Sequence, residues 1–211
     1  MAYAKAAVNC CDLGGVKDHL LSVQSVVVDS KDRLWLLDTG SPKFEPVVKG
    51  AAKLICVDLA SNKVIQTFVM PGSTALSGSY LNDVRFDLSR GKAGMAFITD
   101  SSSSSPGLVV LDLASGESWR RLDGHVSVRP VSGFLPMVEG EPLSDLHVGS
   151  DGIAIGADGK RLYYCPLSSR KLYSVSVDAL CDRAVVDEDV AKAVCDVITK
   201  VASDGLESDS L

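Results

Sequence analysis

The sequence predicts an all-β fold, a β-propeller built from four-stranded blades. Three observations carry this prediction: short apolar strands alternate with polar turns, one strand–turn–strand pattern returns three times, and a second strand–turn–strand module follows each copy. Four short antiparallel strands per repeat, joined by tight turns, are typical of a propeller blade. A sandwich would not explain the regular pairing of modules, and a β-helix would repeat at a shorter period.

The first module of each repeat is an apolar strand that ends near an aspartate, followed by a polar turn and a second apolar strand. Its copies are SVVVDSKDRLWLLDTG at 25–40, DVRFDLSRGKAGMAFITDS at 83–101 and GIAIGADGKRLYYCPLSS at 152–169. We expect Trp35, and Trp119 in the next module, to lie within strands and to pack between blades.

The second module repeats the strand–turn–strand pattern after each first module. Its copies are KLICVDLASNKVIQTF at 53–68, GLVVLDLASGESWRRL at 107–122 and KLYSVSVDAL at 171–180. The serine-rich run 101–105 between the two modules of the second repeat is expected to be a loop. The predicted boundaries are an N-terminal extension at 1–19, blades at about 20–72, 79–126 and 150–200, and the first strand of a further blade at 202–211.

One short helix is expected near the C-terminal end, in DEDVAKAVCDVI at 187–198. Three acidic residues stand at its start, where negative charge suits the helix dipole. Its apolar residues recur with helical spacing and should pack against the propeller. They are Val190, Ala193, Val194, Val197 and Ile198.

The composition excludes several classes of partner. The 211 residues are 46% hydrophobic, which suffices for the core of one domain or of two small ones. With 21 basic and 27 acidic residues the net charge is −6 and no basic cluster occurs, so nucleic acid is not an expected partner. No apolar run approaches the ~18–20 residues of a membrane span. The first residues also lack the continuous apolar segment of a signal peptide.

The six cysteines do not indicate a disulfide scaffold or a zinc site, because they are few and no Cys-x-x-Cys pattern occurs. Cys56 and Cys165 lie in apolar, strand-like runs, where a buried free thiol is expected. Cys181 and Cys195 flank a short acidic segment and could pair in an oxidising compartment. The cysteines leave the compartment open.

Several segments resemble the major royal jelly protein/yellow family. They are SVQSVVVDSKDRLWLLDTG, SYLNDVRFDL, ITDSSSSSPGLVVLDLASGESWRRL and, most specifically, LYYCPLSSRKLYSVSVDAL. The resemblance covers the chain from about Leu20 onward. It implies a six-bladed propeller, distantly related to gluconolactonase and senescence-marker-type propellers. Since family members are longer, we expect this chain to be partial, with about three blades and the start of a fourth.

Candidate binding residues follow from the repeat. One oxygen-bearing side chain stands just before or within each predicted inner strand: Gln24, Asn82, Asp151 and Asp204. Equivalent positions of a propeller should face one axis, where a ring of such oxygens could bind a ligand or a hard cation such as calcium. Ordinary turn chemistry is the alternative, above all for the two aspartates, which both lie in Ser-Asp-Gly. Asp83 is expected to be a turn or rim residue.

The resemblance implies two functions. The first is a secreted, yellow-type propeller that binds a small molecule, such as an amine, in its central channel without a cofactor. The second is a lactonase or esterase of the gluconolactonase type, with a divalent metal held by Asn82, Asp151 and Asp204 that polarises a carbonyl and activates water. Gln24 stands where those hydrolases carry a carboxylate, which favours the first. Part of the family also suggests a dopachrome isomerase. The histidines lack a Ser or Cys partner at a recognisable spacing, so no catalytic triad is expected.

Overall fold

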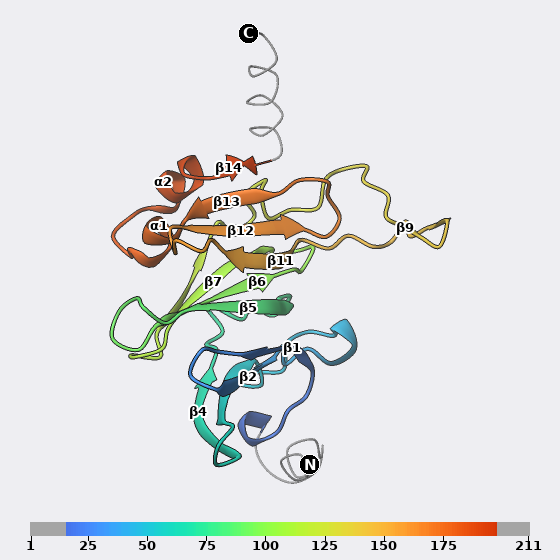
Figure 1. The fold of residues 1–211 in the computed structure, drawn as a ribbon. Coiled ribbons are helices and arrows are strands. Elements are labelled where there is room, and N and C mark those ends of the chain that lie inside the picture. Colours follow the sequence, from blue (N-terminus) through green and yellow to red (C-terminus); the bar gives the residue numbers. More distant parts are fainter. Residues whose placement is uncertain (1–15, 198–211) are drawn as a thin grey trace.

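The computed structural model describes residues 16–197. It contains three four-stranded antiparallel sheets that follow one another along the chain, each with its strands in sequential order (Figure 1). This confirms the predicted all-β fold of four-stranded blades. The sheets consist of β1 (Val23–Val28), β2 (Arg33–Asp38), β3 (Lys53–Asp58) and β4 (Lys63–Val69); β5 (Leu81–Asp87), β6 (Met95–Asp100), β7 (Gly107–Asp112) and β8 (Ser118–Arg121); and β11 (Ser150–Ile155), β12 (Arg161–Pro166), β13 (Tyr173–Ser176) and β14 (Cys195–Asp196).

These sheets, the first, second and third blades below, fall within the predicted ranges 20–72, 79–126 and 150–200. The segment before β1 contains the short 3₁₀ helix η2 (Val16–Asp18), and η3 (Pro42–Phe44) lies between β2 and β3. The predicted strand at 202–211 lies outside the described residues. A small hairpin of β9 (Met137–Val138) and β10 (Glu141–Pro142), which the sequence did not predict, lies in the connection from the second blade to the third and projects away from the sheets (Figure 1).

Aspartates close the tight turns that end the inner strands. The Asp29 carboxylate accepts hydrogen bonds from the backbone amides of Lys31 (2.8 Å) and Arg33 (3.2 Å). Asp87 accepts one from the Ser89 amide at 3.0 Å. Such side chains satisfy backbone donors that the strands leave free. The pattern of an apolar strand ending near an aspartate therefore has a local physical cause.

The two tryptophans pack between blades, as predicted. Trp35 is fully buried, and its ring centroid lies 4.7 Å from that of Phe86 in the second blade. Its Nε1 donates to Asp29 at 2.8 Å, so the buried indole keeps a polar partner. Trp119, in the second blade, donates from Nε1 to the carbonyl of Leu180, next to the third blade, at 3.0 Å.

Apolar side chains form one core between the first two blades and another between the second and third. The first core is centred on Trp35, Leu54, Leu81, Ile98 and Val109. The second contains, among others, Phe97, Leu108, Leu162, Val175 and Leu180. Each blade thus buries one face or both against its neighbours, as expected of stacked sheets.

The end of the third blade corrects two sequence predictions. The helix predicted at 187–198 is present as α2 (Asp187–Lys192), with Val190 buried, but it ends six residues before the predicted end. Residues 195 and 196 form β14 instead, because the edge of β13 offers free backbone groups that pair with them. The module at 171–180 was predicted to follow the strand–turn–strand pattern of its two counterparts. It turns into α1 (Val177–Cys181), with the hydroxyl of Ser176 accepting from the Ala179 amide.

The described cysteines are free thiols. Cys56 is buried, as predicted, whereas Cys165 is half-buried. Cys181 and Cys195 are not paired with each other in this structure. No helix within residues 16–197 is both long and apolar enough to cross a membrane.

Candidate functional site

The first strands of the three blades lie next to one another, with β5 between β1 and β11. Each is irregular near its start: the register shifts between Val23 and Ser25 in β1, between Leu81 and Val84 in β5, and between Ser150 and Gly152 in β11. These are β-bulges, which leave a residue unpaired and redirect its side chain. The unpaired residues are Gln24, Asn82 with Asp83, and Asp151.

The structure brings three of the four predicted site residues together. Gln24 Nε2 donates to Asn82 Oδ1 at 3.0 Å, and the Asn82 side chain lies close enough to the Asp151 carboxyl to lower its pKa. Tyr80 Oη donates to Gln24 Oε1 at 2.9 Å. A continuous chain of polar side chains thus runs across the inner strands of all three blades. The fourth predicted residue, Asp204, lies outside the described residues.

Asp83 is not the turn or rim residue that the sequence predicted. It lies inside β5, in the bulge beside Asn82, and its Oδ1 accepts from Ser25 Oγ at 2.7 Å and from Arg85 Nη1 at 2.8 Å. Two successive bulge residues point in different directions, so Asn82 meets Gln24 of β1 and Asp83 meets the next residue, Ser25. Asp83 therefore joins the first two blades.

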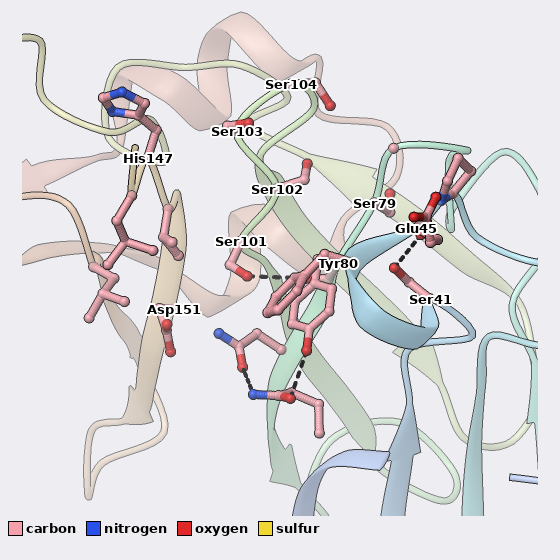
Figure 2. Close-up of a pocket in the computed structure, with 18 of the residues that line it drawn as sticks. Ser41, Glu45, Ser79, Tyr80, Ser101, Ser102, Ser103, Ser104, His147 and Asp151 are labelled. Carbon is pink, nitrogen blue, oxygen red and sulfur yellow. Dashed lines mark hydrogen bonds between the residues drawn. The ribbon is translucent and has the colours of Figure 1, made fainter. Parts of the chain in front are cut away.

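A cavity of about 730 Å³ opens around Gln24, Asn82 and Asp151, which we call the axial pocket. Figure 2 shows Asp151 and Tyr80 facing it from different blades, with the serine-rich loop 101–105 above them. Loops of the first two blades and the segment that leads into β11 complete its wall. The lining residues are Gln24, Ser41, Phe44–Pro46, Ser77–Tyr80, Asn82, Ser101–Ser104, Asp145–Val148, Asp151 and Leu167.

The lining combines acidic, hydroxyl and aromatic groups. Three carboxylates face the axial pocket, those of Glu45, Asp145 and Asp151, and the lining residues, all in the described part of the chain, include no lysine or arginine. Phe44 and Tyr80 stack with their ring centroids 4.6 Å apart. Phe44 is nevertheless 80% exposed, so one ring face remains free for a ligand. This composition suits a positively charged, partly apolar molecule.

Burial raises the pKa of the Asp151 carboxyl, because the charged form is desolvated. The Asn82 side chain lowers the pKa, and the nearby charge of Asp83 raises it further. Burial, followed by the charge of Asp151, also raises the pKa of Tyr80. Negative charge is therefore costly in this pocket, and a bound cation would relieve the cost.

Two of the three predicted metal ligands lie in the part of the chain that the structure describes, and the third, Asp204, lies outside it. Asn82 and Asp151 are adjacent, but within residues 16–197 no three His, Cys, Asp or Glu side chains are placed to hold a metal ion. The amide oxygens of Gln24 and Asn82 already accept hydrogen bonds from Tyr80 and Gln24. Asp151 is the only carboxylate among the predicted site residues that the structure describes. A hard divalent cation normally binds several carboxylate or carbonyl oxygens.

One histidine has a serine partner that the sequence spacing did not reveal. His125 Nδ1 lies 2.8 Å from Ser127 Oγ, which in turn lies 2.8 Å from Tyr164 Oη. Ser127 is fully buried, so its hydroxyl cannot meet a substrate, and the network has a structural role.

A second cavity of about 590 Å³ lies at the opposite ends of the inner strands. Two of its three carboxylates, those of Asp29 and Asp87, are engaged by Arg33 and Arg90, and the third, Asp158, is exposed. The charges of Asp29 and Asp87 are thus neutralised within the fold, in contrast to those of the axial pocket.

Sequence reasoning missed the aromatic pair Phe44–Tyr80 and the carboxylates of Glu45 and Asp145. Tyr80 stands two residues before Asn82, a spacing that could have signalled it. Phe44 had no such signal, because its position depends on the fold of the loop between β2 and β3.

The family model for Major royal jelly protein matches residues 21–208. The chain belongs to the major royal jelly protein family. Major royal jelly protein 7 of Apis mellifera is 28% identical over 166 residues, which make up 74% of this chain and 35% of that protein. The yellow-related salivary protein SP04 of Phlebotomus argentipes is 27% identical over 184 residues, 79% of this chain and 44% of that protein.

This member of the family therefore spans less than half the length of the curated relatives it matches. Among solved structures, a chain of hydrazine synthase from Kuenenia stuttgartiensis has a TM-score of 0.49 and 15% identity, over 80% of this chain and 44% of that chain. The family resemblance predicted from the sequence is confirmed by the family match.

Proposed function

We propose that this major royal jelly-type chain binds a small molecule with an ammonium group in the axial pocket. The observation that carries the proposal is Asp151, a half-buried carboxyl group whose pKa is raised by burial and which faces a pocket lined without lysine or arginine. A ligand cation would supply the counter-charge that the described lining lacks.

The surrounding groups suit such a ligand. The chain from Tyr80 through Gln24 and Asn82 orients the amide groups and leaves the carboxylate of Asp151 as the charged acceptor at its end. The aromatic pair of Phe44 and Tyr80 offers a ring face for cation–π contact or for stacking on an aryl group. The serine hydroxyls of the wall can accept the remaining ammonium hydrogens.

The charge of Asp151 should dominate the affinity for the ammonium group. A hydrogen bond to a charged partner contributes about 1.5–3 kcal/mol. Since each 1.4 kcal/mol is a tenfold change in Kd, replacing Asp151 by Asn should weaken binding roughly 10- to 150-fold.

Isothermal titration with two probes of nearly equal shape tests this proposal. We expect 2-phenylethylamine, which is cationic at pH 7, to bind, and 2-phenylethanol, which is neutral, to bind at least tenfold more weakly. Asp151→Asn should abolish that preference. Asp158→Asn is the matched control, because this exposed aspartate follows the same strand at its other end. Equal affinity for both probes, or an unchanged preference in Asp151→Asn, would refute the proposal.

The alternative, a divalent-metal-dependent lactonase or esterase, gains no support from the described residues. Gln24 supplies an amide where a carboxylate ligand would be needed, and its oxygen is already used by Tyr80. Tight calcium binding that competes with 2-phenylethylamine would reverse this preference.

We further propose that the protein is secreted. The support is the names of its relatives, which place them in royal jelly and in saliva. An antibody against the chain should detect it in secreted fluid of the source organism; detection in cell lysate alone would contradict the proposal.

A further inference from the structure

Two buried aspartates occupy equivalent positions behind the axial pocket. Asp38 is the last residue of β2 and Asp100 the last residue of β6, and both are fully buried. Asp38 accepts hydrogen bonds from the backbone amides of Leu21 (2.8 Å) and Ser22 (3.0 Å), just before β1. Asp100 accepts one from the Tyr80 amide at 2.9 Å, just before β5. Each aspartate thus fixes the start of an inner strand.

The two aspartates receive their positive charge from different strands. In the first blade the residue opposite Asp38 is Lys53, whose Nζ lies 3.0 Å from Oδ2. In the second blade the residue opposite Asp100 is Gly107, which has no side chain. The charge comes instead from Arg120 on β8, whose Nη1 lies 2.8 Å from Asp100 Oδ2.

Gly107 leaves room for this guanidinium. A Cβ atom added at Gly107 would lie 2.8 Å from Arg120 Nη2 and 2.5 Å from Asp123 Oδ1, closer than such contacts allow. Gly107 is not among the glycines with positive φ, so the space and not the backbone conformation requires glycine here. In the first blade the corresponding space holds the Lys53 side chain.

Arg120 binds both loops that the second blade contributes to the pocket wall. Nη1 donates to the carbonyl of Thr74 at 2.8 Å and Nη2 to the carbonyl of Ser105 at 2.7 Å. Asp100 adds an acceptor for the Ser102 amide at 3.2 Å. The guanidinium is almost fully buried, with 6% of the side chain exposed. A planar group with five donors in a fixed fork can bind acceptors on both sides of its plane edge at once, whereas the three donors of a lysine all lie at one point.

We infer that Arg120 is a positioning residue that, together with Asp100, holds the loops 74–80 and 101–105 in place, and that Gly107 is required to admit its guanidinium. The consequence for ligand binding rests on the proposed function of the axial pocket. The Tyr80 backbone is fixed by Asp100, and its hydroxyl then reaches Gln24.

Hydrogen exchange of the ligand-free protein, followed by mass spectrometry, tests the positioning role. Arg120→Met should raise exchange at least tenfold in both loops, with peptides of the first blade unchanged. In the double variant Arg120→Met/Gly107→Lys, the new lysine stands opposite Asp100 as Lys53 stands opposite Asp38, so protection of the Tyr80 amide, which Asp100 binds, should return. Arg183→Met, which removes an exposed arginine, should leave both loops unchanged.

Arg120→Lys separates the ion pair with Asp100 from the contact with the Ser105 carbonyl, because a lysine can keep Asp100 paired without reaching Ser105. It should keep the Tyr80 amide protected while loop 101–105 exchanges faster. The inference fails if the double variant is no better folded or protected than Arg120→Met, or if Arg120→Lys leaves loop 101–105 unchanged. Since no ligand is present in these experiments, a failure of the amine proposal would not alter their outcome. If both proposals hold, the affinity for 2-phenylethylamine should fall in Arg120→Met and recover in the double variant.

Discussion

Replacing Lys53 by Met should destabilise the first blade severely. Lys53 and Asp38 are both fully buried, and Lys53 Nζ also donates to the carbonyls of Val16 (3.1 Å), His19 (2.5 Å) and Ala51 (3.0 Å). Methionine has a similar length but no donor, so it leaves a buried carboxylate and three carbonyls without this partner. Breaking a buried ion pair from one side costs about 3–5 kcal/mol. The total stability of a domain is typically about 5–15 kcal/mol.

Urea denaturation measures this loss. With an m-value of about 1–3 kcal/mol/M, a loss of about 3–5 kcal/mol lowers the unfolding midpoint by on the order of 1–5 M. Lys63→Met, an exposed lysine of β4, should change the free energy of unfolding by less than about 0.5 kcal/mol. Adding Asp38→Asn to Lys53→Met should recover part of the loss, because the orphaned charge is removed. A loss below about 1 kcal/mol for Lys53→Met, or none recovered in the double variant, would refute this reasoning.

Three further predictions follow from single positions. The raised pKa of Asp151 means that the folded state holds this proton more tightly than the unfolded state, so the wild type loses stability as pH rises above the ordinary pKa of about 3.9. The free energy of unfolding of Asp151→Asn relative to wild type should therefore be larger at pH 7 than at pH 4 in urea denaturation. The same difference at pH 4 and at pH 7 would contradict this. Gly40 has φ +63°, and a Cβ atom there would lie 2.5 Å from Ala52 N. Gly40→Ala should therefore lower the free energy of unfolding by about 1–3 kcal/mol or more, measured by thermal denaturation. An unchanged Tm would show that this turn does not require glycine. Arg121 donates to the carbonyls of Leu180 and Asp182, so Arg121→Met should speed hydrogen exchange in residues 177–192 while blade one stays protected; unchanged exchange there would show that other contacts hold these helices.

The blades could be predicted from the sequence because their signals are local. Alternating apolar residues and aspartate-closed turns are properties of neighbouring residues, and their recurrence revealed the repeat. Trp35 could be placed between blades for the same reason, as a large side chain in a buried strand. The early end of α2 and the pairing of β14 depend on the free edge of β13, which a local pattern does not contain.

The site could be predicted only as far as the repeat reaches. Equivalence of the blades indicated that Gln24, Asn82 and Asp151 would converge, and the structure brings them together. The bulges that redirect these side chains were not predicted, and the wrong expectation for Asp83 followed from that. Phe44 enters the pocket through the path of an irregular loop, for which no periodic pattern exists.

A crystal structure of the protein with 2-phenylethylamine tests the central claim most directly. The account predicts the ligand nitrogen within about 3 Å of a carboxylate oxygen of Asp151, as in a charge-assisted hydrogen bond, with the aryl ring against Phe44 or Tyr80. A ligand bound in the second cavity at the other ends of the inner strands, or one whose nitrogen avoids Asp151, would contradict it.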